Sequence, residues 1–154
     1  MIDKSKAVSL SGNRQLLLDF DKDKLKFELE ALIKKGFNSF LCGMAVGFDT
    51  ECFLILKELR EIYPINIYAC VPCKDQDKNF SDNDKEIYRL LLKESDEIIL
   101  LSEHYYNGCM IVRNKFMVDN SERVIAVWNG ENAGGTAFTI KYASRQGKEI
   151  YLIS

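Results

Sequence analysis

The stretch VIAVWNGENAGGTAFTIKYA, residues 124–143, decides the expected fold because it contains three kinds of local structure in order. Its first four residues are apolar and mostly β-branched, which is typical of a buried strand. A glycine-containing loop follows, and apolar side chains then recur at helical spacing in residues 137–143. The stretch therefore predicts a strand, a glycine loop and a helix N-terminus, where unpaired N–H groups and the helix dipole favour a phosphate.

The same alternation of short apolar runs and helical patterns extends along the whole chain. Six runs are typical of strands: residues 7–10, 39–42, 65–70, 97–101, 124–127 and 150–153. Between them, apolar residues keep helical spacing around residues 25–33, 52–59, 87–91, 110–118 and 140–143. Such alternation predicts an α/β fold, a three-layer α/β/α sandwich with a mainly parallel central sheet.

Length and composition bound the class of protein. The 154 residues and 17.7 kDa fit one domain, residues 1–154. With 21 basic and 23 acidic side chains, the net charge of -2 gives no general attraction to nucleic acid. Neither an apolar run of about 18 residues nor a secretory leader is visible, so we expect no membrane partner and a cytoplasmic location.

Five cysteines are spread along the chain without the dense spacing of a secreted disulfide scaffold, so we expect reduced thiols. Residues 70–73 form a C-x-x-C motif, and Cys109 and His104 would complete a set of four zinc ligands. A second C-x-x-C motif is absent, and Cys52 and Cys70 fall in apolar patterns. We therefore interpret these cysteines as small buried side chains and expect no metal site. No nucleophile motif accompanies His104, so a catalytic triad is unsupported.

The connections that follow the strands carry most of the glycine, asparagine and charged residues. They are residues 11–14, 43–49, 72–74, 102–108 and 128–136. Because ligands of open α/β sheets bind beside the carboxyl ends of the strands, we expect the site at this edge. The chain lacks both G-x-G-x-x-G after its first strand and G-x-x-x-x-G-K-[ST], which argues against ordinary dinucleotide binding and P-loop NTPase activity.

Several side chains near this edge suit a phosphate or a sugar. Arg14 offers a planar guanidinium for bidentate phosphate binding. Asp49 suits either a ribose hydroxyl or the positive end of its own helix. By themselves, Arg113 and Asn114 on a predicted helix are interpreted as structural.

Aromatic residues also stand beside the strand ends. For Tyr105, Tyr106 and Trp128, stacking on a base and packing against loops are both open.

Ordered motifs along the chain resemble a known family. They are G-N-R at 12–14, the loop 43–49, P-C at 72–73 with Gln76 and Phe80, Y-Y-N-G-C at 105–109, R-N-x-x-M-V-D at 113–119 and G-G-T-x-x-T-x-x-Y-A at 134–143. Over nearly the whole chain, they resemble the YpsA-like branch of the SLOG superfamily, named for the Smf/DprA and Lonely-Guy proteins.

The resemblance implies a Rossmann-like fold that binds a nucleotide or nucleotide-derived ligand of the mononucleotide or ADP-ribose type. The ligand-binding residues it implies are Gly12, Asn13, Arg14, Gly43, Met44, Gly47, Asp49, Arg113, Asn114, Asn129, Gly134, Gly135 and Thr136. It also allows a homo-oligomer.

The chain departs from the catalytic pattern of the Lonely-Guy enzymes, which cleave the N-glycosidic bond of nucleoside monophosphates. Those enzymes carry P-G-G-x-G-T-x-x-E, whereas residues 133–139 read AGGTAFT and lack the proline, the extra glycine and the glutamate. We therefore expect a phosphate-binding turn without that carboxylate. The expected function is a sensor or regulatory module that requires no cofactor beyond its nucleotide-type ligand.

Two alternatives stand beside this expectation. One is an N-glycoside hydrolase that uses another carboxylate, Asp49 or Glu51. The other is single-stranded DNA binding similar to that of Smf/DprA, which the acidic composition and the lack of a basic track with interleaved aromatics disfavour.

Overall fold

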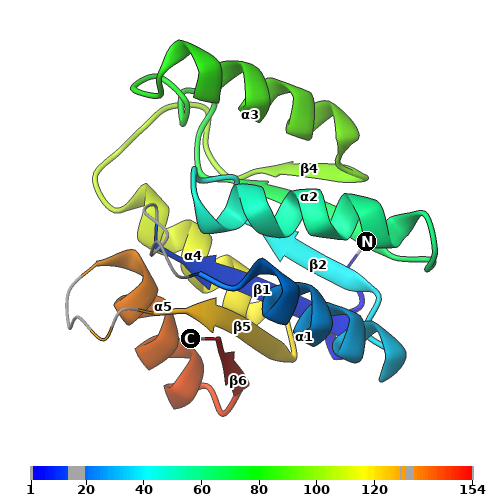
Figure 1. The fold of residues 1–154 in the computed structure, drawn as a ribbon. Helices are drawn as coiled ribbons and strands as arrows, with labels where there is room; N and C mark the ends of the chain where they lie inside the picture. Colours follow the sequence, from blue (N-terminus) through cyan, green and yellow to red (C-terminus); the bar gives the residue numbers. More distant parts are fainter. Residues whose placement is uncertain (1, 14–19, 129, 131–133, 154) are drawn as a thin grey trace.

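A six-stranded, fully parallel sheet in the order β4-β3-β2-β1-β5-β6 organises the chain (Figure 1). The computed structural model describes residues 2–13, 20–128, 130 and 134–153. The strands are β1 (Ala7–Gly12), β2 (Ser39–Cys42), β3 (Asn66–Val71), β4 (Glu97–Leu100), β5 (Arg123–Val127) and β6 (Glu149–Leu152). The six predicted strands and the parallel sheet are confirmed.

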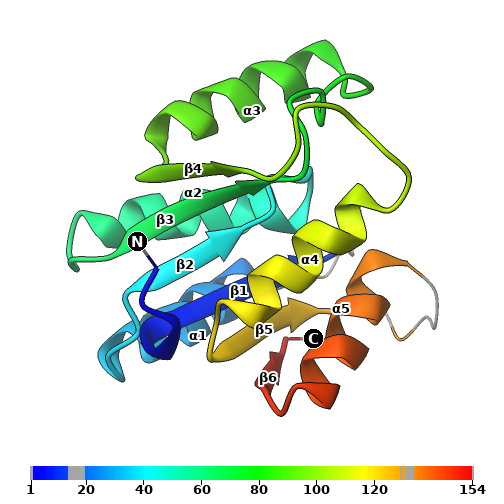
Figure 2. The ribbon, with the colours of Figure 1, turned by 180° about the vertical axis from the view of Figure 1, so that it is seen from behind.

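Helices cover both faces of this sheet. After a short 3-10 turn, η1 (Lys4–Lys6), they are α1 (Lys22–Lys34), α2 (Phe48–Arg60), α3 (Asp82–Glu94), α4 (Cys109–Asp119) and α5 (Gly135–Arg145). α1, α2 and α3 lie on one face, and α4 and α5 lie on the other (Figures 1 and 2). Successive strands from β1 to β4 step in one direction and the later ones in the other, so right-handed crossovers place the two groups of helices on opposite faces. The predicted α/β/α layers are confirmed.

The apolar core is divided unequally between the two faces. On the α1–α3 face, one continuous cluster includes Leu29, Phe40 and Phe53. The α4–α5 face holds two smaller clusters, around Met117 and Val118. Among the described residues, no helix is long and apolar enough to cross a membrane.

Two apolar residues within the helical patterns lie on exposed faces. Leu90 is 55% exposed on α3 and Ile111 is 43% exposed on α4. α3 buries Tyr88 and Leu91, so a tyrosine forms part of its packed stripe. The buried stripe of α4 includes Arg113, and apolar periodicity misses a stripe that contains a charged side chain.

The helices begin in two different ways. The side chains of Asp21 and Ser81 accept N–H hydrogen bonds at the starts of α1 and α3. α2, α4 and α5 begin after Gly47, Gly108 and Gly134, which have φ of 91°, 94° and 101°, and they have no side-chain cap. The N–H groups of Phe48 and Cys109 donate to the carbonyls of Asn13 and Tyr106, and the remaining first-turn N–H groups of the three helices lie at the carboxyl edge of the sheet.

A close contact between β1 and α2 requires glycine at position 12. A Cβ atom there would lie 2.2 Å from Cγ and 2.5 Å from Cβ of Phe48, whose side chain is fully buried. Gly12→Ala should therefore lower the free energy of unfolding by about 1–3 kcal/mol, as overpacking does. Urea denaturation measures this loss. Gly135→Ala is the matched control, since the nearest atom to its added methyl, Nδ2 of Asn114, is 3.6 Å away. Equal stability of the two variants would contradict the packing argument.

Candidate ligand-binding site

A cavity of about 330 Å³ opens at the carboxyl edge of the sheet, a size suited to a small ligand. It lies beside the ends of β1 and β2 and the starts of α4 and α5. The strand order reverses between β1 and β5, so this is the switch point at which open α/β sheets bind ligands. We call it the switch-point cavity; its lining residues are Leu10, Ser11, Gly12, Asn13, Gly43, Ala45, Asp49, Met110, Arg113, Asn114, Met117, Gly135 and Thr136.

Most of the predicted ligand residues come together in this cavity. Those that line it are Gly12, Asn13, Gly43, Asp49, Arg113, Asn114, Gly135 and Thr136. Gly47 and Gly134 do not line it but form the N-caps of α2 and α5. Arg14 and Asn129 lie outside the described residues.

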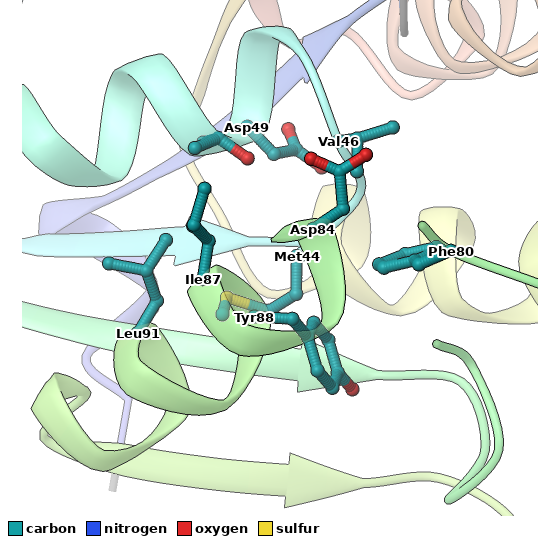
Figure 3. A pocket seen from close by; sticks show the side chains of 9 residues that line it. Met44, Val46, Asp49, Phe80, Asp84, Ile87, Tyr88 and Leu91 are labelled. Atoms are coloured by element: carbon teal, nitrogen blue, oxygen red, sulfur yellow. The ribbon is translucent and has the colours of Figure 1, made fainter. Parts of the chain in front are cut away.

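The side chain of Met44 lies in the core and not in the switch-point cavity. Its φ is 63°, which is uncommon for a residue with a side chain, and the side chain is buried in the larger core. It faces Tyr88 and Leu91 around a small hollow of about 10 Å³ (Figure 3). That hollow is too small for a nucleotide, so the Met44 side chain packs the connection between β2 and α2 against the core.

A buried guanidinium is the main charged group of the switch-point cavity. Arg113 is only 6% exposed. Its Nη1 donates to the carbonyl oxygens of Gly43 and Cys70, at the ends of β2 and β3. Its Nε donates to Oδ1 of Asn114 over 2.9 Å, and Nη2 lies 3.8 Å from the sulfur of Met110, a weak acceptor. The main chain fixes the guanidinium and leaves donor capacity on the cavity side.

The charge of Arg113 has no bonded counter-charge in the described part of the chain. None of the ion pairs formed there includes it. Asp49 lies close enough for the charge of Arg113 to lower the pKa of its carboxyl group, but no salt bridge joins the two, and carbonyl dipoles replace only part of the hydration of a buried cation. The arrangement therefore favours an anion in the cavity.

Asp49 is the buried carboxyl group of the same cavity. It lies in the first turn of α2, is 7% exposed, and its Oδ2 accepts the N–H of Ala45 over 3.0 Å. Burial raises its pKa to about 6, although the charge of Arg113 and the Ala45 hydrogen bond both lower it. Asp49 can therefore accept a hydroxyl proton or exchange a proton near neutral pH.

The side chains of Arg113 and Asp49 both lie against Gly43. A Cβ at this position would lie 2.9 Å from Cζ of Arg113 and 3.2 Å from Oδ2 of Asp49. Its carbonyl also accepts Nε2 of Gln76 over 2.9 Å, and Oε1 of Gln76 accepts the hydroxyl of Tyr88 over 3.1 Å. Tyr88 was not predicted, because one tyrosine on an amphipathic helix gives no sequence signal for a site.

The start of α5 provides backbone donors on the cavity wall. Gly135 and Thr136 are the first residues of the helix, and Gly134 supplies no side-chain cap. The amide of Asn114 lies beside Gly135. An uncapped helix N-terminus facing a cavity is suited to an anion.

Other predicted chemistry lies elsewhere. Glu51 does not line the switch-point cavity, and its carboxylate pairs with Lys22 over 3.1 Å. His104 is exposed in the loop after β4. All five cysteines are free and buried, as expected. The residues described contain no group of three or more His, Cys, Asp or Glu side chains arranged for a metal ion.

Comparison with known families decides the assignment. The YpsA model, described as the YspA SLOG family, matches residues 6–154. The chain belongs to this SLOG family. It is 32% identical over 138 residues to YoqJ, an SPbeta prophage-derived protein of Bacillus subtilis (strain 168), and the match covers 80% of each chain. A UPF0398 protein of Bacillus pumilus is 25% identical over 129 residues, which cover 82% of this chain and 69% of that protein.

Solved structures agree on the SLOG fold. DNA processing protein A (DprA) from Streptococcus pneumoniae gives a TM-score of 0.68 at 16% identity over 97% of this chain. DprA from Helicobacter pylori, whose structure is described for its single-stranded DNA binding mode, gives a TM-score of 0.68 at 17% identity over 99% of this chain. The chain spans only 50% and 66% of those two structures. The likeness establishes a Rossmann-like fold.

The buried carboxyl of Asp49 should make stability depend on pH. Because its pKa is raised from 3.8 to about 6, the folded protein holds the proton more tightly than the unfolded chain, and stability is lost as pH rises from about 4 to above 6. The free energy of unfolding of Asp49→Asn, relative to that of the parent, should therefore increase over this pH range. The increase is up to about 3 kcal/mol for a shift of about two pKa units. Denaturation at pH 4, 6 and 8 measures the difference. Asp23→Asn, an equivalent change at an exposed site in α1, controls for surface charge. A difference for Asp49→Asn that is constant with pH would contradict this account.

Proposed function

We propose that the chain binds a nucleotide or nucleotide-derived ligand, of the mononucleotide or ADP-ribose type, in the switch-point cavity. The main observation behind this proposal is that the Arg113 guanidinium and the uncapped start of α5 line the same cavity. One supplies a buried positive charge and the other supplies backbone N–H donors, which together suit a phosphate.

The rest of the cavity suits a sugar beside that phosphate. Asp49 supplies a carboxyl acceptor, and Asn13 and Asn114 supply amides that both donate and accept. Small residues such as Gly12, Gly43 and Gly135 let a ligand approach the main chain closely. The proposed binding requires no metal ion or additional cofactor.

We infer a sensor or regulatory role, because the hydrolase pattern is incomplete. The residue at the position of the Lonely-Guy glutamate is Thr139, which is buried. Its hydroxyl donates to the carbonyl of Gly135 over 2.9 Å, within α5. A helix-internal hydrogen bond therefore occupies the position where the enzymes carry a carboxylate.

A negative charge at the start of α5 should abolish binding. Gly135→Glu should weaken the affinity for AMP, ADP or ADP-ribose at least about tenfold, because its carboxylate would oppose the phosphate. The fold should tolerate it, since acidic residues suit the first turn of a helix. Gly135→Gln, of equal size and no charge, is the matched control.

Isothermal titration calorimetry with the three nucleotides measures these affinities. Absence of binding to all three, or equal binding by the Glu and Gln variants, would show the assignment to be wrong. A single-stranded oligonucleotide belongs in the same panel because of the DprA neighbours. Binding of the oligonucleotide alone, with steep salt dependence, would move the function to nucleic acid.

A second candidate function, N-glycoside hydrolysis, is favoured by Asp49 alone. A carboxyl group with a pKa of about 6 inside a ligand cavity is suited to general acid or base chemistry. If the chain is a hydrolase, it releases free base from nucleoside monophosphates, and Asp49→Asn lowers that rate at least about a hundredfold. Glu51→Gln, outside the cavity, is the control. Our proposal of a binding module predicts no base release by the parent chain, as measured by chromatography.

A further inference from the structure

A second cavity of about 500 Å³ adjoins the switch-point cavity. Its walls come from residues 75–80, in the connection between β3 and α3, and from Tyr105 and Met110. Met110 lines both cavities. Gln76 lines the second one and hydrogen-bonds the carbonyl of Gly43, which lines the first. The two cavities therefore share a wall at Met110, and we call the second one the aromatic cavity.

Two aromatic side chains give the aromatic cavity its character. The ring of Phe80 is half-buried and held edge-on against the ring of Tyr88, with centroids 5.6 Å apart and planes at 86° (Figure 3 shows both side chains). Tyr105 is 59% exposed and lies in the connection between β4 and α4. Its ring is therefore accessible at the cavity wall, where the face of an aromatic ring can stack on a flat ligand group.

Contacts beside Tyr105 join the connection between β3 and α3 to the connection between β4 and α4. The pKa of the Asp75 carboxyl group is lowered, chiefly by the thiol of Cys73 and to a smaller extent by the backbone of Tyr105, so Asp75 lies close to that backbone. Beside it, the N–H of Lys74 donates to the carbonyl of Glu103, and the two side chains form an ion pair of 2.7 Å. The two connections are thus joined near Tyr105, which lines the second cavity from the later of them.

We infer that the aromatic cavity is a nucleobase subsite, in which the base stacks on Tyr105 and Phe80 while the phosphate binds beside Arg113. This inference rests on the proposed function and deepens it, because it specifies a base-bearing ligand and not a sugar phosphate or a free phosphate. Stacking on aromatic rings provides base affinity without requiring one particular base. The polar side chains of Asp75, Lys78 and Asn79 at the same walls can meet the edge of the base.

The test compares AMP with ribose 5-phosphate, which differs only by the missing base. Tyr105→Ala should weaken AMP binding at least about fivefold, the lower end of base–aromatic stacking, and leave ribose 5-phosphate binding unchanged. Tyr105→Phe should keep the affinity for AMP. Tyr106→Ala is the matched control, because this neighbouring tyrosine is 44% exposed and does not line the cavity. Calorimetry measures all four proteins and both ligands.

The outcomes separate the subsite from the function on which it rests. If Tyr105→Ala binds AMP like the parent, while Gly135→Glu loses it, the phosphate site stands and the base subsite is wrong. Equal losses of AMP and ribose 5-phosphate in Tyr105→Ala would also overturn the subsite, because the base would not be what Tyr105 contacts. If the parent binds neither ligand, the proposed function fails and the subsite fails with it.

Discussion

The burial of one guanidinium constrains the arrangement of the whole carboxyl edge. Arg113 extends from α4 to the carbonyl oxygens that end β2 and β3, so it fixes that helix against the sheet. The same contact requires glycine at position 43, because a side chain there would overlap the guanidinium. Gln76 donates to the same carbonyl of Gly43, and the hydroxyl of Tyr88 donates in turn to Gln76. A lysine at position 113, with a single ammonium group, could not make this set of planar contacts.

The two faces of the sheet differ in their apolar packing and in the residues that they contribute to the switch-point cavity. The α1–α3 face carries the continuous core with its phenylalanines and leucines. The α4–α5 face has smaller apolar clusters and contributes Arg113, Asn114 and the first residues of α5 to the site. This division explains how a buried cation is tolerated, because the larger core supplies most of the hydrophobic stabilisation.

The sequence predicted the fold well and the site in part, for identifiable reasons. The strands and helices could be predicted from the spacing of apolar residues along the chain. Most of the cavity residues could be predicted from the glycine-rich connections at one edge of the sheet and from the family resemblance. The dominant role of Arg113 did not follow from the residues alone, since a charged side chain on a helix is usually solvated. The sequence also did not predict which way each loop residue faces. Met44 has a left-handed φ, and its side chain lies in the core. Glu51 lies outside the cavity although it is two residues from Asp49.

The contrast between capped and uncapped helix starts has a thermodynamic consequence. α1 and α3 carry their own hydrogen-bond acceptors, Asp21 and Ser81, so their first turns are complete in the free protein. α5 begins without one and leaves its first donors to solvent. Any anion that accepts from those donors would complete the helix, so its binding energy would add to the stability of the α4–α5 layer by mass action. Occupancy of the cavity and the order of that layer would then be a single coupled equilibrium.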